Sequence, residues 1–410
     1  MLKKSPYTLK KIGPLIDLLS GFAFKSNEFS DVATTEQHIR LLRGINITEN
    51  AIRNNDTIDK FWFNSSTDLD KYYLKEGDLV ISMDGSKVGR NYALVSPKDL
   101  PSLLVQRVAR IRAKEGLHLP FLHQLIGSKI FTNYVDSVKT SSGIPHISAK
   151  QIKEFSIPLP NIAIQQKIAE ILSTVDKKID LIDQKIAETE KLKTGLMQKL
   201  FSKGVGVQDE NGEWQPHTDY ETLEGSKIPK GWLKTTLSQV IKVKSGDSLS
   251  KKNMKEGCIP VFGGNGISGY HSKANFNSPQ LVIGRVGEYC GAVHITPEKS
   301  WITDNALLIT ETLINVSFEF LYYLLVSVDL NKYASRNAQP LVSGRTLNLV
   351  TVKVPQEAEQ YEIVNILSTV DRKLILLNRQ IEETRRLKKG LMQKLLTGEW
   401  RVPVEETEAA

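Results

Sequence analysis

The side chains of this chain that could do chemistry are basic and amide groups in glycine- and serine-rich loops of two separate regions. Arginine and lysine can pair with guanine edges or phosphates, and asparagine can pair with adenine. One such residue alone is more often a solvated surface residue than a contact, but two clusters of them favour a nucleic acid partner. In the first region the candidate contacts are Lys25, Ser26, Arg43, Asn46, Lys87, Arg90, Ser141, Ser142 and His146. In the second they are Lys244, Ser245, Lys251, Lys252, Asn253, Asn265, Arg285, Asn305, Arg336, Asn337 and Arg345.

The net charge of +8 is concentrated in the same two regions. Residues 1–160 hold 22 Lys/Arg against 16 Asp/Glu, and residues 230–355 hold 14 against 8, so each region carries +6. Two separate basic blocks fit two modules that bind a polyanion such as double-stranded DNA. Ordinary surface solvation is the alternative that charge alone leaves open.

Motifs of catalysis are missing from the sequence. It has no GxxxxGK[ST], no GxGxxG between a strand and a helix, and no Asn-Pro-Pro-aromatic or Asp-Pro-Pro-aromatic tetrapeptide. The run 263–266 fits a glycine turn, and Asp84 precedes a glycine in a second turn. Neither the seven histidines nor Cys258 and Cys290 have metal or triad spacing. The pattern indicates a binding protein that has no catalytic, cofactor or metal site of its own; a nuclease is the alternative class.

Hydropathy gives no reason to expect a membrane protein. No stretch approaches the roughly 18–20 apolar residues of a membrane span. The basic start of the chain has no apolar run of signal-peptide length behind it. With two cysteines that read as small buried hydrophobes, we expect a reducing, cytoplasmic location.

A long repeated stretch separates and follows the two basic regions. Residues 160–200 and 355–395 align at an offset of 195 with 23 of 41 positions identical. Both copies have apolar residues at the 3–4 spacing of a coiled-coil helix, so each is expected to pair with the other. The predicted seam consists of Ile168, Leu172, Val175, Ile179, Ile182, Ile186, Leu196 and Leu200, then Ile363, Leu367, Val370, Leu374, Leu377, Ile381, Leu391 and Leu395.

Three positions in each copy differ from the residues expected in a coiled-coil helix that serves only for packing. Polar residues occupy two seam positions, and a glycine lies inside the helix, where it costs up to about 1 kcal/mol relative to alanine. Exceptions retained in both copies indicate a crossing point of the helices or a docking surface for another chain. They are Thr189, Lys193 and Gly195, repeated as Thr384, Lys388 and Gly390.

The basic regions also repeat each other, which predicts two domains of one fold. At an offset of 225, Ser20-Gly21 matches Ser245-Gly246, and at 198 Val88-Gly89 matches Val286-Gly287. Short strands and one helical run at residues 120–137 predict mixed α/β domains in an α+β chain. Antiparallel pairing of the long helices would give pseudo-twofold symmetry. The expected parts are domain 1 at 1–156, a helix at 157–203, a linker at 204–229, domain 2 at 230–351, a second helix at 352–400 and a tail at 401–410.

This arrangement resembles the specificity subunit of type I restriction–modification enzymes. The matching segments span nearly the whole chain, and no one of them would be specific by itself. The second domain departs from the pattern, because Leu341 stands where the first domain has His146. The segments are SGFAFKS at 20–26, GIPHIS at 143–148, IPLP at 157–160, IPKGW at 228–232, and both copies of ILSTVD and GLMQKL.

The resemblance implies a non-catalytic DNA reader. Each target-recognition domain would read one half of a split DNA sequence, while the helices would fix the spacer and dock two modification (methyltransferase) subunits. S-adenosylmethionine would be bound by those partners, which flip out and methylate an adenine. Restriction subunits would bring ATP, Mg and cleavage. The alternative is an interaction scaffold whose basic domains bind DNA without sequence preference.

Overall fold

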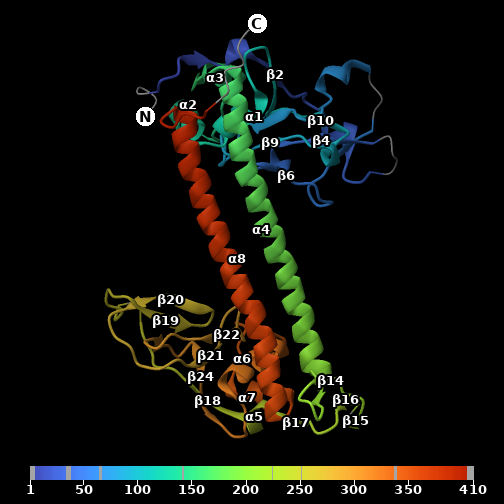
Figure 1. The fold of residues 1–410 in the computed structure, drawn as a ribbon, viewed down its shortest axis with the longest axis vertical. Coiled ribbons are helices and arrows are strands. Elements are labelled where there is room, and N and C mark those ends of the chain that lie inside the picture. The colour runs from blue at the N-terminus through green and yellow to red at the C-terminus, as the bar shows by residue number, and fades with distance from the viewer. Residues whose placement is uncertain are drawn as a thin grey trace. The chain divides into compact units, whose positions relative to one another are not determined.

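The computed structural model divides the chain into two units, which are described separately (Figure 1). Unit 1 consists of Met1–Ile182 and Gln380–Ala410, and unit 2 of Asp183–Arg379. Each unit therefore contains one mixed α/β domain together with parts of both long helices. The structure describes residues 5–33, 38–63, 67–140, 143–223, 225–250, 252–336 and 339–403.

The core of unit 1 is an antiparallel sheet in the order β2-β11-β8-β9. The strands are β2 (Ile16–Ser20), β11 (Val108–Ala113), β8 (Leu79–Ser82) and β9 (Tyr92–Leu94). Strand β8 is buried along its whole length, as expected for an apolar strand at the centre of a sheet. Helices α1 (Leu119–Ile126) and α2 (Lys129–Val138) pack on this sheet through apolar side chains such as Phe121 and Phe131.

The helical run expected at residues 120–137 is broken into these two helices. Gly127 ends α1, and the Ser128 hydroxyl caps α2 by accepting a hydrogen bond from the backbone N–H of Ile130. A Cβ atom at Gly127 would lie 2.1 Å from the Tyr92 hydroxyl, so only glycine fits beside the sheet. The prediction of one continuous helix was wrong. The break comes from the close approach of α1 to β9, and the spacing of apolar residues along the sequence does not reveal that contact.

A second sheet and several short pieces complete unit 1. Strands β10 (Ser102–Leu104) and β4 (Ile39–Leu42) are parallel neighbours, followed by β7 (Phe61–Trp62) and β3 (Phe29–Ser30). The hairpin of β5 (Ile47–Thr48) and β6 (Ala51–Ile52) contacts β9. Near the helix junction, β1 (Leu9–Lys11) pairs with β12 (Ser156–Pro158), and α3 (Ala149–Glu154) precedes β12.

Unit 2 repeats this plan with a smaller second sheet. Its central sheet has the order β18-β24-β21-β22, built from β18 (Ile241–Ser245), β24 (Ala306–Thr312), β21 (Leu281–Gly284) and β22 (Val293–Ile295). The second sheet contains β20 (Gly266–His271), β19 (Ile259–Gly263) and β23 (Trp301–Ile302), with β19 and β23 parallel. The remaining elements are β17 (Leu233–Thr236), paired with β25 (Thr351–Val354), and helices α5 (Leu237–Val240), α6 (Phe318–Val328) and α7 (Gly344–Leu347).

The repeated Ser-Gly dipeptide holds the same place in both units. The Gly21 N–H donates to the Val108 carbonyl at 3.0 Å, and the Gly246 N–H donates to the Ala306 carbonyl at 3.2 Å. A Cβ atom at Gly21 would lie 2.1 Å from the Val105 carbonyl oxygen. Glycine is therefore required where two strands come together, and the predicted equivalence at an offset of 225 is confirmed.

The predicted match of Val88-Gly89 with Val286-Gly287 was wrong by four residues. The Gly85 N–H donates to the Pro145 carbonyl, and the Gly287 N–H donates to the Pro340 carbonyl, both at 3.0 Å. Gly85 is therefore the counterpart of Gly287, at an offset of 202. Each loop holds two glycines with positive φ, four residues apart, so a sequence match can slip from one to the other.

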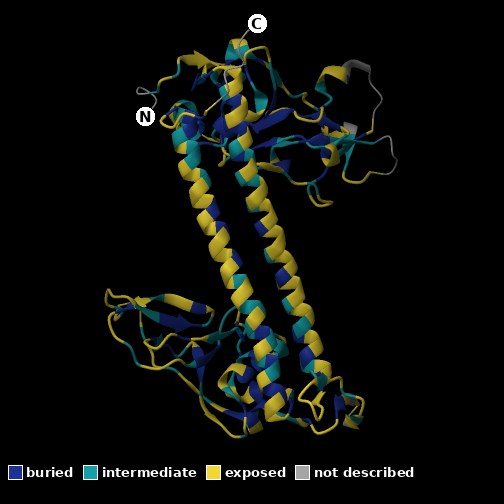
Figure 2. Cartoon of the chain, in the orientation of Figure 1, coloured by how far each residue is buried: buried dark blue, intermediate teal, exposed yellow. Residues whose placement is uncertain are grey.

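The two long helices, α4 (Ile162–Lys203) and α8 (Glu357–Thr397), pair in antiparallel fashion within each unit. In unit 1, Leu172 near the start of α4 shares a core with Leu395 near the end of α8. In unit 2, Leu200 near the end of α4 shares a core with Leu367 near the start of α8. Every predicted seam residue is buried or half-buried, while most of the other positions on both helices are exposed (Figure 2).

The polar seam residues have partners inside the chain. Lys193 Nζ lies 2.6 Å from Asp371 Oδ1 in unit 2, and Lys388 Nζ lies 2.6 Å from Asp176 Oδ1 in unit 1. The buried threonine hydroxyls, including that of Thr189, donate to the carbonyl four residues earlier in their own helix. The lysines therefore serve the pairing of the helices, while the threonines satisfy their buried hydroxyls within their own helix.

The segment at 204–229, expected to be a linker, contains two hairpins, β13 (Val207–Gln208) with β14 (Trp214–Gln215) and β15 (Tyr220–Leu223) with β16 (Ser226–Pro229). The start of the segment, its His217 and the nearby Trp232 meet at the buried carboxylate of Glu359 in α8. That carboxylate accepts from the backbone of Val205 at 2.8 Å and of Gly206 at 3.0 Å, and from Trp232 Nε1 at 2.8 Å. It also lies 2.9 Å from His217 Nε2. The segment is thus fastened to unit 2.

Candidate nucleic-acid interface

Unit 1 contains a basic groove of about 900 Å³ where three loops meet. The loops follow β4, β8 and β10, and they bring together residues distant in sequence. Five basic side chains against two acidic ones give the groove a positive potential, which suits a phosphate backbone. The charged lining residues are Arg43, Arg53, Lys87, Arg90, Arg107, Glu49 and Asp84.

Arg107 is the most constrained of these side chains, and it was not among the contacts predicted from the sequence. Its backbone φ is +66°, a left-handed conformation that a non-glycine residue adopts at some cost. Its carbonyl accepts from the Met83 N–H at 2.8 Å, and its guanidinium lies 3.0 Å from Asp84 Oδ2. The side chain stays 62% exposed, so its remaining N–H groups face the groove and solvent. Strained residues of this kind gather at binding sites.

Two predicted contacts after β4 have different surroundings. Arg43 lines the groove and donates to the Ile58 carbonyl, but its Nε is buried without a hydrogen-bond partner in the described residues. Asn46 is fully buried, and its amide donates to Asp59 Oδ1 at 2.9 Å and to the Arg53 carbonyl at 3.2 Å. Asn46 as a DNA contact is therefore withdrawn, because its hydrogen-bonding groups hold the loop together.

Lys87 and Arg90 lie in the loop after β8, as predicted from the sequence. Both are exposed and line the groove. Arg90 Nη2 lies 3.4 Å from Asp136 Oδ2, a surface pair of little energetic weight that leaves the guanidinium accessible. These two cations are suited to phosphate contacts.

The other predictions in unit 1 fall outside the groove. Lys25 and Ser26 are exposed in the segment after β2. His146 is half-buried and forms a backbone bridge with Asp84, so it contacts a loop of the groove, but it is not among the residues that line the groove. Ser141 and Ser142 lie outside the described residues.

Unit 2 brings together Ser245, Arg285 and Asn305, three of its predicted contacts. Arg285 Nη1 donates to Ser245 Oγ at 3.2 Å and to the Asp304 carbonyl at 3.3 Å. The Arg285 N–H donates to the Asn305 carbonyl at 2.9 Å. The side chain of Asn305 is exposed beside this cluster.

Arg107 and Asn305 occupy the same position in the two domains. Each lies in the turn that leads into the long strand β11 or β24, at the offset of 198 that also relates Ile111 and Ile309. In each unit its carbonyl accepts from the backbone at the end of the neighbouring central strand, through Met83 or Arg285. The offset of 198 that pairs Ile111 with Ile309 also pairs Arg107 with Asn305, which was already a predicted contact. This match is the sequence signal that could have identified Arg107.

The remaining predicted contacts of unit 2 are dispersed. Lys244 lies 6.0 Å from the Phe276 ring centroid, Arg336 Nη2 donates to Asn331 Oδ1 at 3.0 Å, and Arg345 is exposed on α7. Lys252 and Asn253 are exposed in the loop after β18, whereas Lys251 and Asn337 lie outside the described residues. The structure does not gather these residues into one site.

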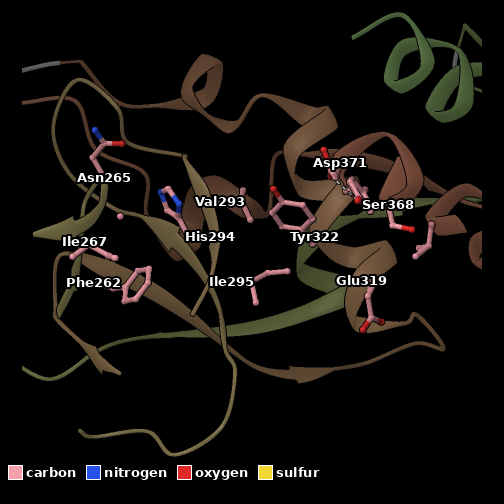
Figure 3. Close-up of a pocket in the computed structure, with 13 residues that line it drawn as sticks. Phe262, Asn265, Ile267, Val293, His294, Ile295, Glu319, Tyr322, Ser368 and Asp371 are labelled. Atoms are coloured by element: carbon pink, nitrogen blue, oxygen red, sulfur yellow. Dashed lines mark hydrogen bonds between the residues drawn. The ribbon is translucent and has the colours of Figure 1, made fainter. Parts of the chain in front are cut away.

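Unit 2 also has a cavity of about 660 Å³, and Figure 3 shows Tyr322 of α6 and His294 of β22 lining it. In unit 1 the β5–β6 hairpin reaches α1, where Asn50 Oδ1 lies 2.6 Å from His123 Nε2, and burial lowers the pKa of His123 to about 4. Asn265, a predicted DNA contact, lines this cavity.

The described part of the chain has neither a metal-binding cluster nor a membrane-spanning helix. Among those residues, no group of three or more His, Cys, Asp or Glu side chains could hold a metal ion. None of the helices there is long and apolar enough to span a membrane.

Comparison with known proteins identifies the family. Residues 4–191 and 229–385 match the family described as the type I restriction modification DNA specificity domain. The chain is 26% identical over 358 residues to the type I restriction enzyme MjaVIII specificity subunit of Methanocaldococcus jannaschii, covering 80% of each protein. It is 34% identical over 174 residues to the EcoAI specificity subunit of Escherichia coli, covering 41% of this chain and 28% of that protein.

The fold is also shared with a solved structure. The S subunit of a type I restriction–modification system from M. genitalium superposes with a TM-score of 0.63 at 19% identity, covering 96% of both chains. Both domains matched by the family contain the equivalent turn that displays Arg107 or Asn305. The chain therefore belongs to the specificity subunits of type I restriction–modification systems, the non-catalytic proteins that recognise DNA sequence through two target-recognition domains.

Proposed function

We propose that this chain reads a bipartite double-stranded DNA target, with one domain for each half-site, and that its paired helices set the unread spacer between them. The helices also hold two modification subunits and the restriction subunits. In this assembly S-adenosylmethionine, ATP and Mg belong to the partner subunits, and the complex works on cytoplasmic DNA.

One observation carries this proposal. Equivalent turns, held by equivalent backbone hydrogen bonds, display Arg107 in one domain and Asn305 in the other. Arginine pairs best with guanine and asparagine with adenine in the major groove. A shared frame that carries different base-reading side chains is what two readers of different sequences require.

The basic groove supplies the sequence-independent part of binding. Lys87 and Arg90 are exposed at its edge and would neutralise phosphates, each adding a counterion-release contribution to affinity. Arg107, held by Asp84 at 3.0 Å, would be aimed at a base edge. Phosphate contacts position the domain and base contacts specify the sequence.

Two matched variants test this division of roles. With the chain bound to its modification subunit, Arg107→Ala should relax selectivity at one base of the half-site read by domain 1, by about 1–3 kcal/mol, because one bidentate contact is lost. Lys87→Ala should weaken binding to all sequences equally and lower the slope of log K against log salt by about 1. Binding to a library of randomised half-sites at several salt concentrations measures both. Equal effects of Arg107→Ala on every sequence would contradict the proposal.

A further inference from the structure

The turn that carries Arg107 is closed and held by backbone hydrogen bonds. The Val108 N–H donates to the Val105 carbonyl at 3.2 Å, which closes a β-turn whose two central residues are Gln106 and Arg107. From outside the turn, the Phe22 carbonyl accepts a hydrogen bond from the Gln106 N–H at 2.7 Å. These bonds fix the point from which each of the two central side chains leaves the backbone.

Unit 2 has a turn closed in the same way. The Ala306 N–H donates to the Thr303 carbonyl at 3.0 Å, so the central residues of this turn are Asp304 and Asn305. The offset of 198 pairs the four residues of one turn with the four of the other. Each domain therefore presents two neighbouring polar side chains from one shared frame, and the two domains differ at both positions.

Gln106 has the position and the chemistry of a base reader. Its side chain is exposed and lines the basic groove beside Arg107. Turn chemistry does not account for this pair of residues, because the third position of a turn with positive φ favours glycine or asparagine, and here it is an arginine at +66°. The glutamine amide offers one donor and one acceptor in the geometry that pairs with N6 and N7 of adenine.

Asp304 holds the corresponding place in unit 2. Its carbonyl accepts a hydrogen bond from Arg285 Nη1 at 3.3 Å, and the same nitrogen donates to Ser245 Oγ at 3.2 Å. The side chain of Asp304 is half-buried. A carboxylate repels phosphates, but it accepts a hydrogen bond from the N4 amino group of cytosine. The residue is therefore suited to a base edge and not to the DNA backbone.

We propose that each turn reads two neighbouring base pairs, so that Gln106 and Asp304 are specificity-determining residues. In domain 1, Gln106 reads an A·T pair beside the G·C pair read by Arg107. In domain 2, Asp304 reads a C·G pair beside the A·T pair read by Asn305. Consecutive Cα atoms lie about 3.8 Å apart and stacked base pairs about 3.4 Å, so adjacent turn residues match adjacent pairs. This inference rests on the proposed function and names part of the target in each half-site.

Two reciprocal variants, Gln106→Glu and Asp304→Asn, test the assignment. Both keep the shape of the side chain, so each should melt at the temperature of the natural chain. Binding is measured with the full chain in complex with its modification subunit and a library of randomised half-sites. Gln106→Glu should change the preference from A·T to C·G at one position of the half-site for domain 1, by about tenfold or more in relative affinity, because glutamate accepts from cytosine. Asp304→Asn should change C·G to A·T at one position of the other half-site.

A switch from one base pair to another is a result that a merely structural role would not produce. Gln106→Ala is the second variant in domain 1, and it should accept every base pair at that position while keeping the G·C preference beside it. Glu115→Gln is the matched control. It changes one charge at an exposed position beyond the other end of β11 and should leave both half-sites unchanged.

The outcomes separate this inference from the proposed function. Reciprocal variants whose base preferences stay the same, or weaken equally for all sequences, would overturn the inference while a bipartite preference of the natural complex left the proposed function intact. A half-site for domain 1 without an A·T pair beside a G·C pair would also overturn the inference. A natural complex with no bipartite preference would overturn the proposed function itself.

Discussion

Replacing Lys388 with methionine should destabilise unit 1 more than replacing Lys193 with methionine destabilises unit 2. Each lysine lies 2.6 Å from its aspartate partner, but the Lys388–Asp176 pair is less exposed than the Lys193–Asp371 pair. The side chains of Lys388 and Asp176 are each 18% exposed, against 25% and 26% for Lys193 and Asp371. The two pairs form a matched experiment within one chain.

The magnitudes follow from burial. Removing the cation from a fully buried pair costs about 3–5 kcal/mol, and exposed pairs are worth about 0.2–1 kcal/mol. Without its lysine, Asp176 keeps the Gln124 amide at 2.9 Å, and Asp371 keeps the Tyr323 hydroxyl at 2.7 Å. We expect about 2 kcal/mol for Lys388→Met and about 1 kcal/mol for Lys193→Met, between these limits.

A double-mutant cycle separates the pair from its surroundings. Urea unfolding, followed by circular dichroism, gives the free energy of each variant, and an unchanged m-value shows that the unfolded state is the same. Lys388→Met combined with Asp176→Asn should cost less than the sum of the single changes, by about 1–2 kcal/mol. Additive costs, or a larger cost at Lys193 than at Lys388, would refute the ion-pair explanation of the polar seam.

Three further predictions concern other parts of the fold. Glu359→Ala should lower the free energy of unfolding by about 3–5 kcal/mol, because four donors lose their acceptor. Hydrogen–deuterium exchange should show faster amide exchange between residues 205 and 232. Lowering the pH from 7 to 5 should reduce the free energy of unfolding by about 2 kcal/mol through His123, because its folded pKa of about 4 lies below its ordinary 6.5 and the unfolded state binds the proton first. In a plot of the urea midpoint against pH, His123→Gln should flatten the fall between pH 7 and 5. Gly246→Ala should lower the melting temperature, because a Cβ atom there would lie 2.3 Å from the Ile302 carbonyl oxygen, whereas an unchanged value would show that the strand can move aside.

The long helices and their seam were predictable because heptad spacing is a strong and local signal. The sixteen predicted seam residues, the first of them Ile168 and the last Leu395, are buried or half-buried as expected. The partners of the polar seam residues could not be predicted, because spacing places Lys388 on the seam without saying which carboxylate on the other helix it meets. The pairing with Asp176 depends on the antiparallel register.

The candidate site was harder to predict because loops bring distant residues together. Arg107 lay inside an apolar run that looked like one continuous strand, and its positive φ leaves no trace in composition. Asn46 was assigned to DNA because asparagines in loops are usually exposed, yet it is the buried centre of its loop. The slipped match of Val88-Gly89 had the same origin, since one dipeptide cannot fix the register of a loop.

The central claim is that each domain reads its own half of one split site. The most direct measurement is methylome sequencing of a host without other adenine methyltransferases, expressing the natural chain or a chain with residues 1–156 exchanged, together with its modification subunit. The account predicts a bipartite adenine-methylated motif in which the exchange alters one half and leaves the other half and the spacer unchanged. A motif that changes in both halves, or a stable complex without methylation, would contradict it.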